Sequence, residues 1–165
     1  MKKLILGLAA VIAIGGAAAL WQLQGGAQAA PDVAFTDLQG QTVTTQDLRG
    51  KVVLVKFWAT SCTTCIAQMP DTIRHYQDLK SRGFDTIGVA MQYDPPNYVK
   101  NYAETRQLPF PVVIDAQGKL AQAFGDVRLT PTAFLIDKQG NIIKRYLGNY
   151  DEQAFLATVE KALAS

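Results

Sequence analysis

The sequence has few of the residues that hold metal ions or build disulfide scaffolds: two cysteines, Cys62 and Cys65, and one histidine, His75. Two cysteines are too few for a small domain held together by several disulfides. A zinc site made only of cysteine and histidine needs four ligands, one more than the chain supplies. The chain also lacks a basic excess in its body, because its 16 Lys and Arg residues exceed its 14 Asp and Glu residues only by Lys2 and Lys3. We therefore expect no nucleic-acid partner.

The composition fits one ordered domain. Of the 165 residues, 48% are hydrophobic and 18% are charged. This balance is too apolar for a disordered chain and too charged for a protein with many membrane spans. We expect residues 1–29 to act as a signal peptide or an N-terminal membrane anchor, and residues 30–165 to form a single domain that is a monomer.

The first 29 residues have the three parts of a secretory signal. Lys2 and Lys3 precede an apolar run from residue 4 to residue 20, and Ala27-Gln28-Ala29 has the small residues that a signal peptidase needs. Two outcomes stay open. Cleavage near Ala29 is the one we favour, and the alternative is membrane anchoring by residues 4–21, since a spanning helix needs about 20 residues. In both cases the domain lies outside the cytoplasm, where disulfides form.

Apolar, β-branched runs alternate along the chain with segments of helical periodicity. We expect strands at 33–36, 42–44, 51–58, 84–91, 112–114, 132–137 and 141–147. We expect helices at 63–82, from about 97 to before Pro109, at 119–124, and after Asp151. The early strand–helix–strand order, followed by a hairpin and a helix, indicates an α/β fold: a mixed central sheet flanked by helices on both faces.

Cys62 and Cys65 are separated by two residues, directly after the apolar strand and at the start of the longest helix. The first turn of a helix has free N–H groups and a positive dipole end, so the pKa of Cys62 should fall below the usual value of about 8.5. We expect Cys65, one turn further along, to be more buried and close enough to form a disulfide. This pattern predicts two catalytic cysteines: Cys62 attacks a substrate disulfide, and Cys65 resolves the mixed disulfide.

The cysteine pair has two other interpretations. A static disulfide would close a loop of only four residues and would stabilise the fold little. A metal site would need His75, which lies about 15 Å further along the helix than Cys65. We expect no metal site, and we expect His75 to be exposed or half-buried.

A second candidate site lies at Thr130-Pro131, just before an apolar strand. Proline cannot donate a hydrogen bond to a sheet, and it pushes the preceding residue into an extended conformation. A cis bond here would make a tight loop with exposed backbone groups, so that a substrate chain could pair with Thr130 as an added strand. An ordinary trans proline at the start of a strand is the other interpretation.

Three parts of the sequence together resemble the TlpA/ResA-like thiol-disulfide oxidoreductases of bacterial envelopes, a branch of the thioredoxin superfamily. They are the run 51–65 with both cysteines, the run 130–140 with Pro131, and the stretches 35–40 and 48–51. The resemblance implies a thioredoxin fold with a short N-terminal β-hairpin extension and a cis bond at Pro131. It also implies substrate contacts at Trp58, Ser61, Thr130 and Pro131, and a periplasmic protein that acts as a reductant.

The segment around the cysteines departs from the family pattern. Ser61 stands where family members usually carry tryptophan. The smaller side chain leaves the surface around the cysteines more open. Thr64 stands where many members carry proline. The hydroxyls of Thr63 and Thr64 could favour a thiolate on the neighbouring cysteine.

Two further departures concern proton transfer to the buried thiol. Lys56 stands where thioredoxins carry a buried acid, and Gln68 stands where many ResA-like members carry glutamate. Lys56 has two interpretations. Its amine extends from the end of the strand into water, which we favour, or it approaches Cys65 and favours the thiolate there.

The sequence therefore predicts a protein disulfide oxidoreductase whose redox-active Cys62–Cys65 disulfide is its working group, with no other cofactor. Its partners would be protein dithiols or disulfides, for example in cytochrome c or copper-site maturation, and a membrane or periplasmic thiol protein that donates electrons. A peroxiredoxin-like peroxidase is disfavoured, because Val55 and Ala59 stand where that class needs proline and threonine or serine. A copper-binding chaperone of the Sco type is disfavoured, because its cysteines are separated by three residues.

Overall fold

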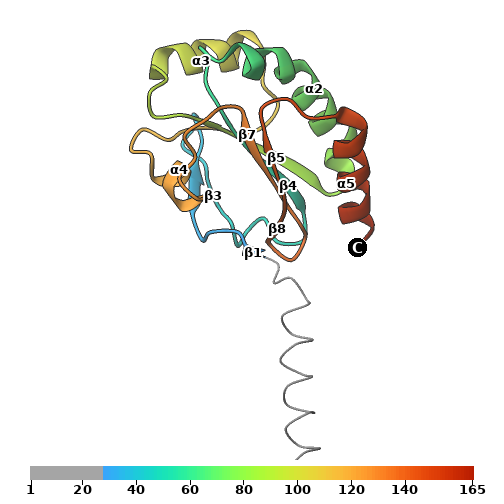
Figure 1. Cartoon of the computed structure of the whole chain (residues 1–165). Coiled ribbons are helices and arrows are strands. Elements are labelled where there is room, and N and C mark those ends of the chain that lie inside the picture. Colours follow the sequence, from blue (N-terminus) through green and yellow to red (C-terminus); the bar gives the residue numbers. More distant parts are fainter. Residues whose placement is uncertain (1–27) are drawn as a thin grey trace, which may run out of the picture.

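The computed structural model describes residues 28–165, and Figure 1 shows a central sheet with helices around it. The strands of the main sheet are β1 Gln28–Ala29, β4 Val52–Trp58, β5 Phe84–Ala90, β6 Val112–Ile114, β7 Thr132–Ile136 and β8 Asn141–Leu147. Across the sheet they follow the order β1-β8-β7-β4-β5-β6. β4, β5 and β6 pair in parallel, whereas β7, β8 and β1 are added by antiparallel pairing.

The remaining elements cover the two faces of this sheet. The helices within the described residues are α2 Thr63–Leu79, α3 Pro96–Thr105, α4 Lys119–Ala123 and α5 Glu152–Ala164, and a 3-10 turn at Lys80–Arg82 continues α2. A separate hairpin pairs β2 Ala34–Thr36 with β3 Thr42–Thr44. Gly83 has φ 93°, so it takes the left-handed conformation that commonly ends a helix.

The alternating side chains of β4 enter two different cores. Val53, Val55 and Phe57 face the layer made by the β2–β3 hairpin and α4. Val52 and Leu54 face the opposite layer, which contains α2 and α5. Because both faces are covered, every side chain of β4 is buried, as the apolar run predicted.

Strand pairing brings three loops to one edge of the sheet. Phe57 of β4 lies opposite both Thr132 of β7 and Val89 of β5. The C-terminal ends of β4 and β5 therefore lie beside the N-terminal end of β7. The loops at these three ends contain Cys62, Asp94 and Pro131 respectively, and Cys65 follows in the first turn of α2.

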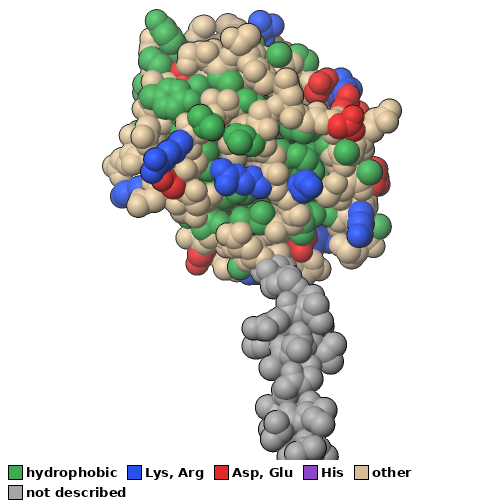
Figure 2. Space-filling view, in the orientation of Figure 1, with side chains coloured by type: hydrophobic (Ala, Val, Ile, Leu, Met, Phe, Trp, Pro, Cys, Tyr) green, Lys and Arg blue, Asp and Glu red, His purple; other side chains and the backbone are tan. Residues whose placement is uncertain are grey.

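Charged side chains are spread over the surface. On the face shown in Figure 2, Lys and Arg side chains lie scattered among acidic and neutral ones, without a single basic patch. This agrees with the balanced charge of the sequence outside its first residues.

The predicted order of strands and helices is confirmed, including the mixed sheet, the N-terminal hairpin and the helices on both faces. Strand β1 was not predicted. Gln28 and Ala29 pair with Ile142 and Asn141, although the sequence suggested that the domain begins at residue 30. Residues 1–27 of the predicted signal or anchor lie outside the described residues. Within 28–165, none of the helices combines the length and the apolar character needed to cross a membrane.

Candidate redox-active site

Cys62 and Cys65 are joined by a disulfide, and their Cα atoms lie 5.2 Å apart. Cys62 is the N-cap residue of α2, and its Sγ accepts a hydrogen bond from the backbone N of Cys65 at 3.2 Å. Cys62 is half-buried, whereas Cys65 is fully buried. The expected asymmetry is thus present: the first sulfur sits at the helix end, within reach of a partner, and the second lies behind it.

The turn that presents Cys62 is held by a buried carboxylate. Asp94, which is 2% exposed, follows β5. It accepts a hydrogen bond from the Thr60 N–H at 2.6 Å and another from the Thr60 hydroxyl at 2.5 Å. The backbone N of Cys62 in turn donates to the Ala59 oxygen at 3.1 Å. Asp94 was not identified as a site residue from the sequence. The signal that could have indicated it is its position shortly after a predicted buried strand.

The Thr130–Pro131 bond is cis, as the sequence resemblance predicted. Pro131 is buried and Thr130 is half-buried. The Thr130 hydroxyl lies 3.1 Å from the Tyr93 hydroxyl, and the oxygen of Pro131 accepts a hydrogen bond from Gly148 N at 2.9 Å. The loop after β5 therefore contacts both neighbours at this edge: Asp94 binds the cysteine loop and Tyr93 binds the proline loop.

Lys56 does not extend into water, so the favoured prediction for this residue is wrong. It is 1% exposed, because it lies on the same face of β4 as Leu54, which α2 covers. Its Nζ donates to Gln68 Oε1 at 2.9 Å and to Thr72 Oγ1 at 3.0 Å, both on α2. Burial lowers the pKa of Lys56 to about 8, and the charge of Asp71 opposes this effect.

Gln68 connects the buried amine to the end of β8. Its Nε2 donates to Gly148 O and to Asn149 Oδ1, each at 3.1 Å. Gly148 also donates to Pro131. A chain of hydrogen bonds thus runs from Lys56 through Gln68 to the loop that supports Pro131.

The other residues expected at the site differ in their access to a partner. Ser61 is exposed beside Cys62, and Thr63 is exposed in the first turn of α2, with Thr64 half-buried behind it. Neither threonine hydroxyl hydrogen-bonds a sulfur within the described residues. Trp58 is 0% exposed and packs against Tyr102, with ring centroids 5.3 Å apart. The prediction that Trp58 contacts the substrate directly is wrong, because its side chain is fully buried beneath the site.

His75 is also placed differently from the expectation. It is 4% exposed, its Nε2 lies 2.8 Å from Glu152 Oε1, and its ring packs on Phe155. The continuing helical period on the buried face of α2 could have indicated this. Among residues 28–165, no cluster of three or more His, Cys, Asp or Glu side chains is arranged to hold a metal ion.

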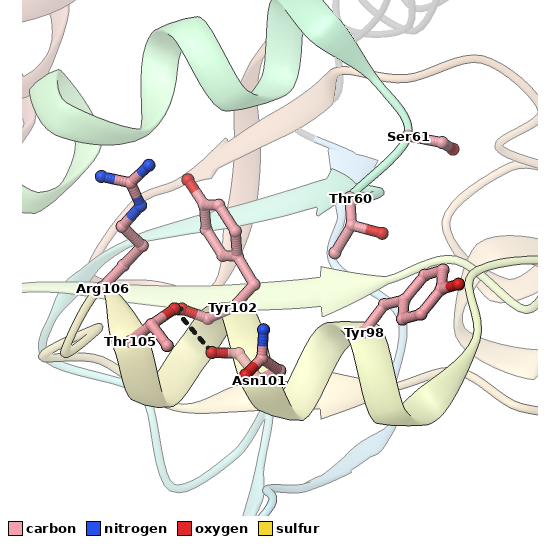
Figure 3. Close-up of a pocket in the computed structure, with 7 residues that line it drawn as sticks. All are labelled: Thr60, Ser61, Tyr98, Asn101, Tyr102, Thr105 and Arg106. Carbon is pink, nitrogen blue, oxygen red and sulfur yellow. Dashed lines mark hydrogen bonds between the residues drawn. The ribbon is translucent and has the colours of Figure 1, made fainter.

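A groove of about 440 Å³ lies beside the disulfide. Thr60 and Ser61 form one side, and five residues of α3 and its C-terminal end form the other: Tyr98, Asn101, Tyr102, Thr105 and Arg106. Figure 3 shows these α3 side chains on the helix face that looks toward the cysteine loop. These residues recur at intervals of three or four along the sequence, which is the spacing of one face of a helix.

Comparisons with known proteins agree with this geometry. A family model described as Redoxin matches residues 25–163. The thiol-disulfide oxidoreductase ResA of Bacillus thuringiensis subsp. konkukian is 36% identical over 125 residues, which cover 75% of this chain and 70% of the relative.

Two solved structures are similar in fold. A Neisseria meningitidis protein described as a thioredoxin gives a TM-score of 0.79 at 37% identity, covering 84% of this chain and 92% of its own. A thiol:disulfide interchange protein of the thioredoxin family from Chlorobium tepidum gives 0.75 at 31% identity, covering 82% and 96%. The predicted thioredoxin fold is confirmed.

Proposed function

Since this chain belongs to the Redoxin family and is a thiol-disulfide oxidoreductase of the ResA type, we propose that it reduces disulfides of other proteins outside the cytoplasm. The observation that carries this proposal is the position of the pair, with half-buried Cys62 at the N-terminus of α2 and buried Cys65 behind it. A helix N-terminus favours the thiolate over the thiol at Cys62, which makes Cys62 the nucleophile.

The exchange takes two steps that balance. In the reduced protein, the Cys62 thiolate attacks one sulfur of a substrate disulfide, forms a mixed disulfide and releases the other substrate sulfur as a thiolate, which takes up a proton. The Cys65 thiol then loses its proton and attacks Sγ of Cys62, which releases the second substrate thiolate. The substrate gains two electrons and two protons, and the protein is left with the Cys62–Cys65 disulfide. A dithiol protein then returns two electrons.

Residues at the sheet edge supply the substrate contacts in this proposal. Ser61 is exposed beside the nucleophile and Thr130 is half-buried at the start of β7. An extended substrate segment would pair with the backbone of Thr130, with Pro131 beneath it, as an added strand. Two exposed side chains beside Thr130 would give that segment apolar contact: Leu129, which precedes it and is 64% exposed, and Tyr93, whose hydroxyl contacts the Thr130 hydroxyl and which is 53% exposed.

The position of β1 supports retention of the N-terminal segment as a membrane anchor on the periplasmic side. Cleavage after Ala29 would remove both residues of β1, which pair with β8. In this proposal, residues 4–21 anchor a domain that begins at residue 28. The N-terminal sequence of the protein isolated from membranes tests it: an anchored protein keeps the residues before 28 and stays with the membranes, whereas a soluble protein that begins at residue 30 contradicts it.

The test of the function is to trap substrates. A Cys65→Ala variant of the full chain should accumulate mixed disulfides on Cys62, because the resolving thiol is missing. The matched control is the Cys62→Ala, Cys65→Ala double variant, which should trap nothing. Thiol partners specific to the single variant would identify the substrates, and apocytochromes c or copper-site assembly proteins are the classes expected. An identical set of proteins from both variants would contradict the proposal.

A further inference from the structure

The groove between α3 and the Thr60–Ser61 turn has a single charged residue. Arg106 lies at its far end from Ser61, just past the last residue of α3. No acidic residue lines the groove, and within residues 28–165 the Arg106 guanidinium makes no ion pair. It lies 5.8 Å from the centre of the Tyr102 ring. The groove thus combines polar walls with one unpaired positive charge.

The groove begins next to the reactive sulfur. Ser61, which lines it, is the residue before Cys62. From Tyr98 to Arg106 the helix rises about 12 Å. An extended peptide covers about 3.3 Å per residue, so three or four residues span this length. Figure 3 shows Ser61 and Tyr98 at one end of the groove and Arg106 at the other, so a segment that starts beside Ser61 would place its third or fourth residue near Arg106.

Arg106 is exposed, but one side of its surroundings is apolar. Arg106 and Tyr102 also line an adjoining hollow whose other walls are apolar side chains of α2, namely Ile66, Met69, Pro70 and Ile73. Charges beside apolar walls are less well screened by water than charges on an open surface. Figure 3 shows the guanidinium directed toward α2, on the same side of α3 as the Tyr102 ring.

From these contacts we infer that the groove binds the substrate segment beside the reacting cysteine, and that Arg106 selects substrates with Asp or Glu three or four residues from that cysteine. This inference rests on the proposed function. It concerns a contact separate from the strand pairing at Thr130, because the groove is formed by α3 and the turn before Cys62. Arg106 acts on substrate preference and not on the sulfur chemistry.

The test uses the full-length chain, reduced beforehand, and peptides that each contain one disulfide loop. The peptides are identical except for Asp or Lys placed three or four residues before or after the attacked cysteine. The rate of peptide reduction at limiting concentration is measured for each. At one or more of these placements, the Asp peptide should react about 2- to 5-fold faster than the matching Lys peptide, which is the range expected for an exposed ion pair. Added salt should reduce this difference in rate.

Two variants of Arg106 and one control complete the experiment. Arg106→Gln should abolish the preference, and Arg106→Glu should reverse it. Lys161→Glu makes the same change of net charge at an exposed position on α5 and should leave the preference as it is. Equal rates for Asp and Lys peptides at every placement would overturn this inference while leaving the reductase function intact. The same conclusion would follow if Arg106→Glu and Lys161→Glu changed the preference between the two peptides equally. If no peptide is reduced at all, the proposed function fails and this inference fails with it.

Discussion

Nζ of Lys56 lies 2.9 Å from Oε1 of Gln68, beneath the helix that begins at the disulfide. Gln68 is one turn after Cys65 on the same helix, and Thr72, the second acceptor of the amine, is one turn further. The sheet face under the two cysteines therefore holds a buried amine that has an amide and a hydroxyl as partners. The Tyr150 ring, with its centre 5.9 Å from Nζ, and Asp71 complete its surroundings.

The buried amine predicts a distinct dependence of stability on pH. The pKa of Lys56 is about 8 in the folded protein, whereas the ordinary value for lysine is 10.5, so the unfolded chain binds more protons between these values. The stability of the wild type should therefore rise relative to Lys56→Met from about pH 8 to pH 10.5, by up to about 3 kcal/mol. Urea unfolding of the oxidised proteins across this range measures it. Lys161→Met, at an exposed site, is the control, and parallel curves for the wild type and Lys56→Met would contradict the prediction.

The same amine should affect the buried thiol. The positive charge is held by Gln68, one turn after Cys65 on α2, and it should favour the Cys65 thiolate, so Lys56→Gln should raise the pKa of the Cys65 thiol and slow resolution of the mixed disulfide. The measurement is thiolate absorbance against pH in a Cys62→Ala background, together with iodoacetamide profiles of the protein with both cysteines. Lys51→Gln is a suitable control, since Lys51 lies in the same segment but pairs with Asp85 near the surface. An unchanged titration in Lys56→Gln would remove the lysine from the mechanism.

The Asp94–Thr60 contact should support both stability and exchange. Thr60→Val leaves one oxygen of a buried carboxylate without its hydroxyl partner, which costs about 1–3 kcal/mol. Asp94→Ala also leaves the Thr60 N–H without its acceptor and should cost more. Because the turn before Cys62 then loosens, exchange should slow in both variants. Unfolding free energies and peptide reduction rates, measured side by side, check this. Thr42→Val, which removes an exposed hydroxyl contact with Thr36 on the N-terminal hairpin, provides the comparison. Losses of stability and rate no greater than in Thr42→Val would show that the Asp94–Thr60 contact has no role.

Acid should weaken the contact between α2 and α5. Hydrogen bonds from His75 and Arg74 lower the pKa of Glu152 below its usual value of 4.5. A carboxylate with a lowered folded-state pKa contributes stability above about pH 4.5 and loses it as the pH falls. Glu152→Gln should therefore show a shallower loss of stability from pH 5 to pH 3 than the wild type does. Urea midpoints at several pH values test this, with the exposed Glu104→Gln as control.

Much of the site could be predicted because its features are local. The spacing of Cys62 and Cys65, their place between an apolar strand and a periodic helix, and the proline before β7 are all readable along the chain. Helix position also explains why Cys62 is the more accessible sulfur, since the first turn lies at the end of α2. The sequence resemblance added the cis bond at Pro131.

Residues whose environment depends on distant segments were predicted less well. Lys56 was predicted to reach water, although its place on the same face of β4 as Leu54 puts it under α2. His75 was placed at the surface, although α5 supplies Glu152 and Phe155 to cover it. Asp94 was not identified, because its partner Thr60 lies 34 residues away.

The order of the elements, the redox pair and its orientation follow from local sequence, because strand alternation, helical period and helix polarity act over a few residues. Which polar groups become buried partners depends instead on how distant elements pack. Packing of α2 over β4 gives Lys56 its amide and hydroxyl acceptors, and the parallel pairing of β4 with β5 brings Asp94 to Thr60. The position of α3 against the cysteine turn forms the groove that ends at Arg106. These contacts join segments far apart in the chain, and only the completed sheet fixes their register.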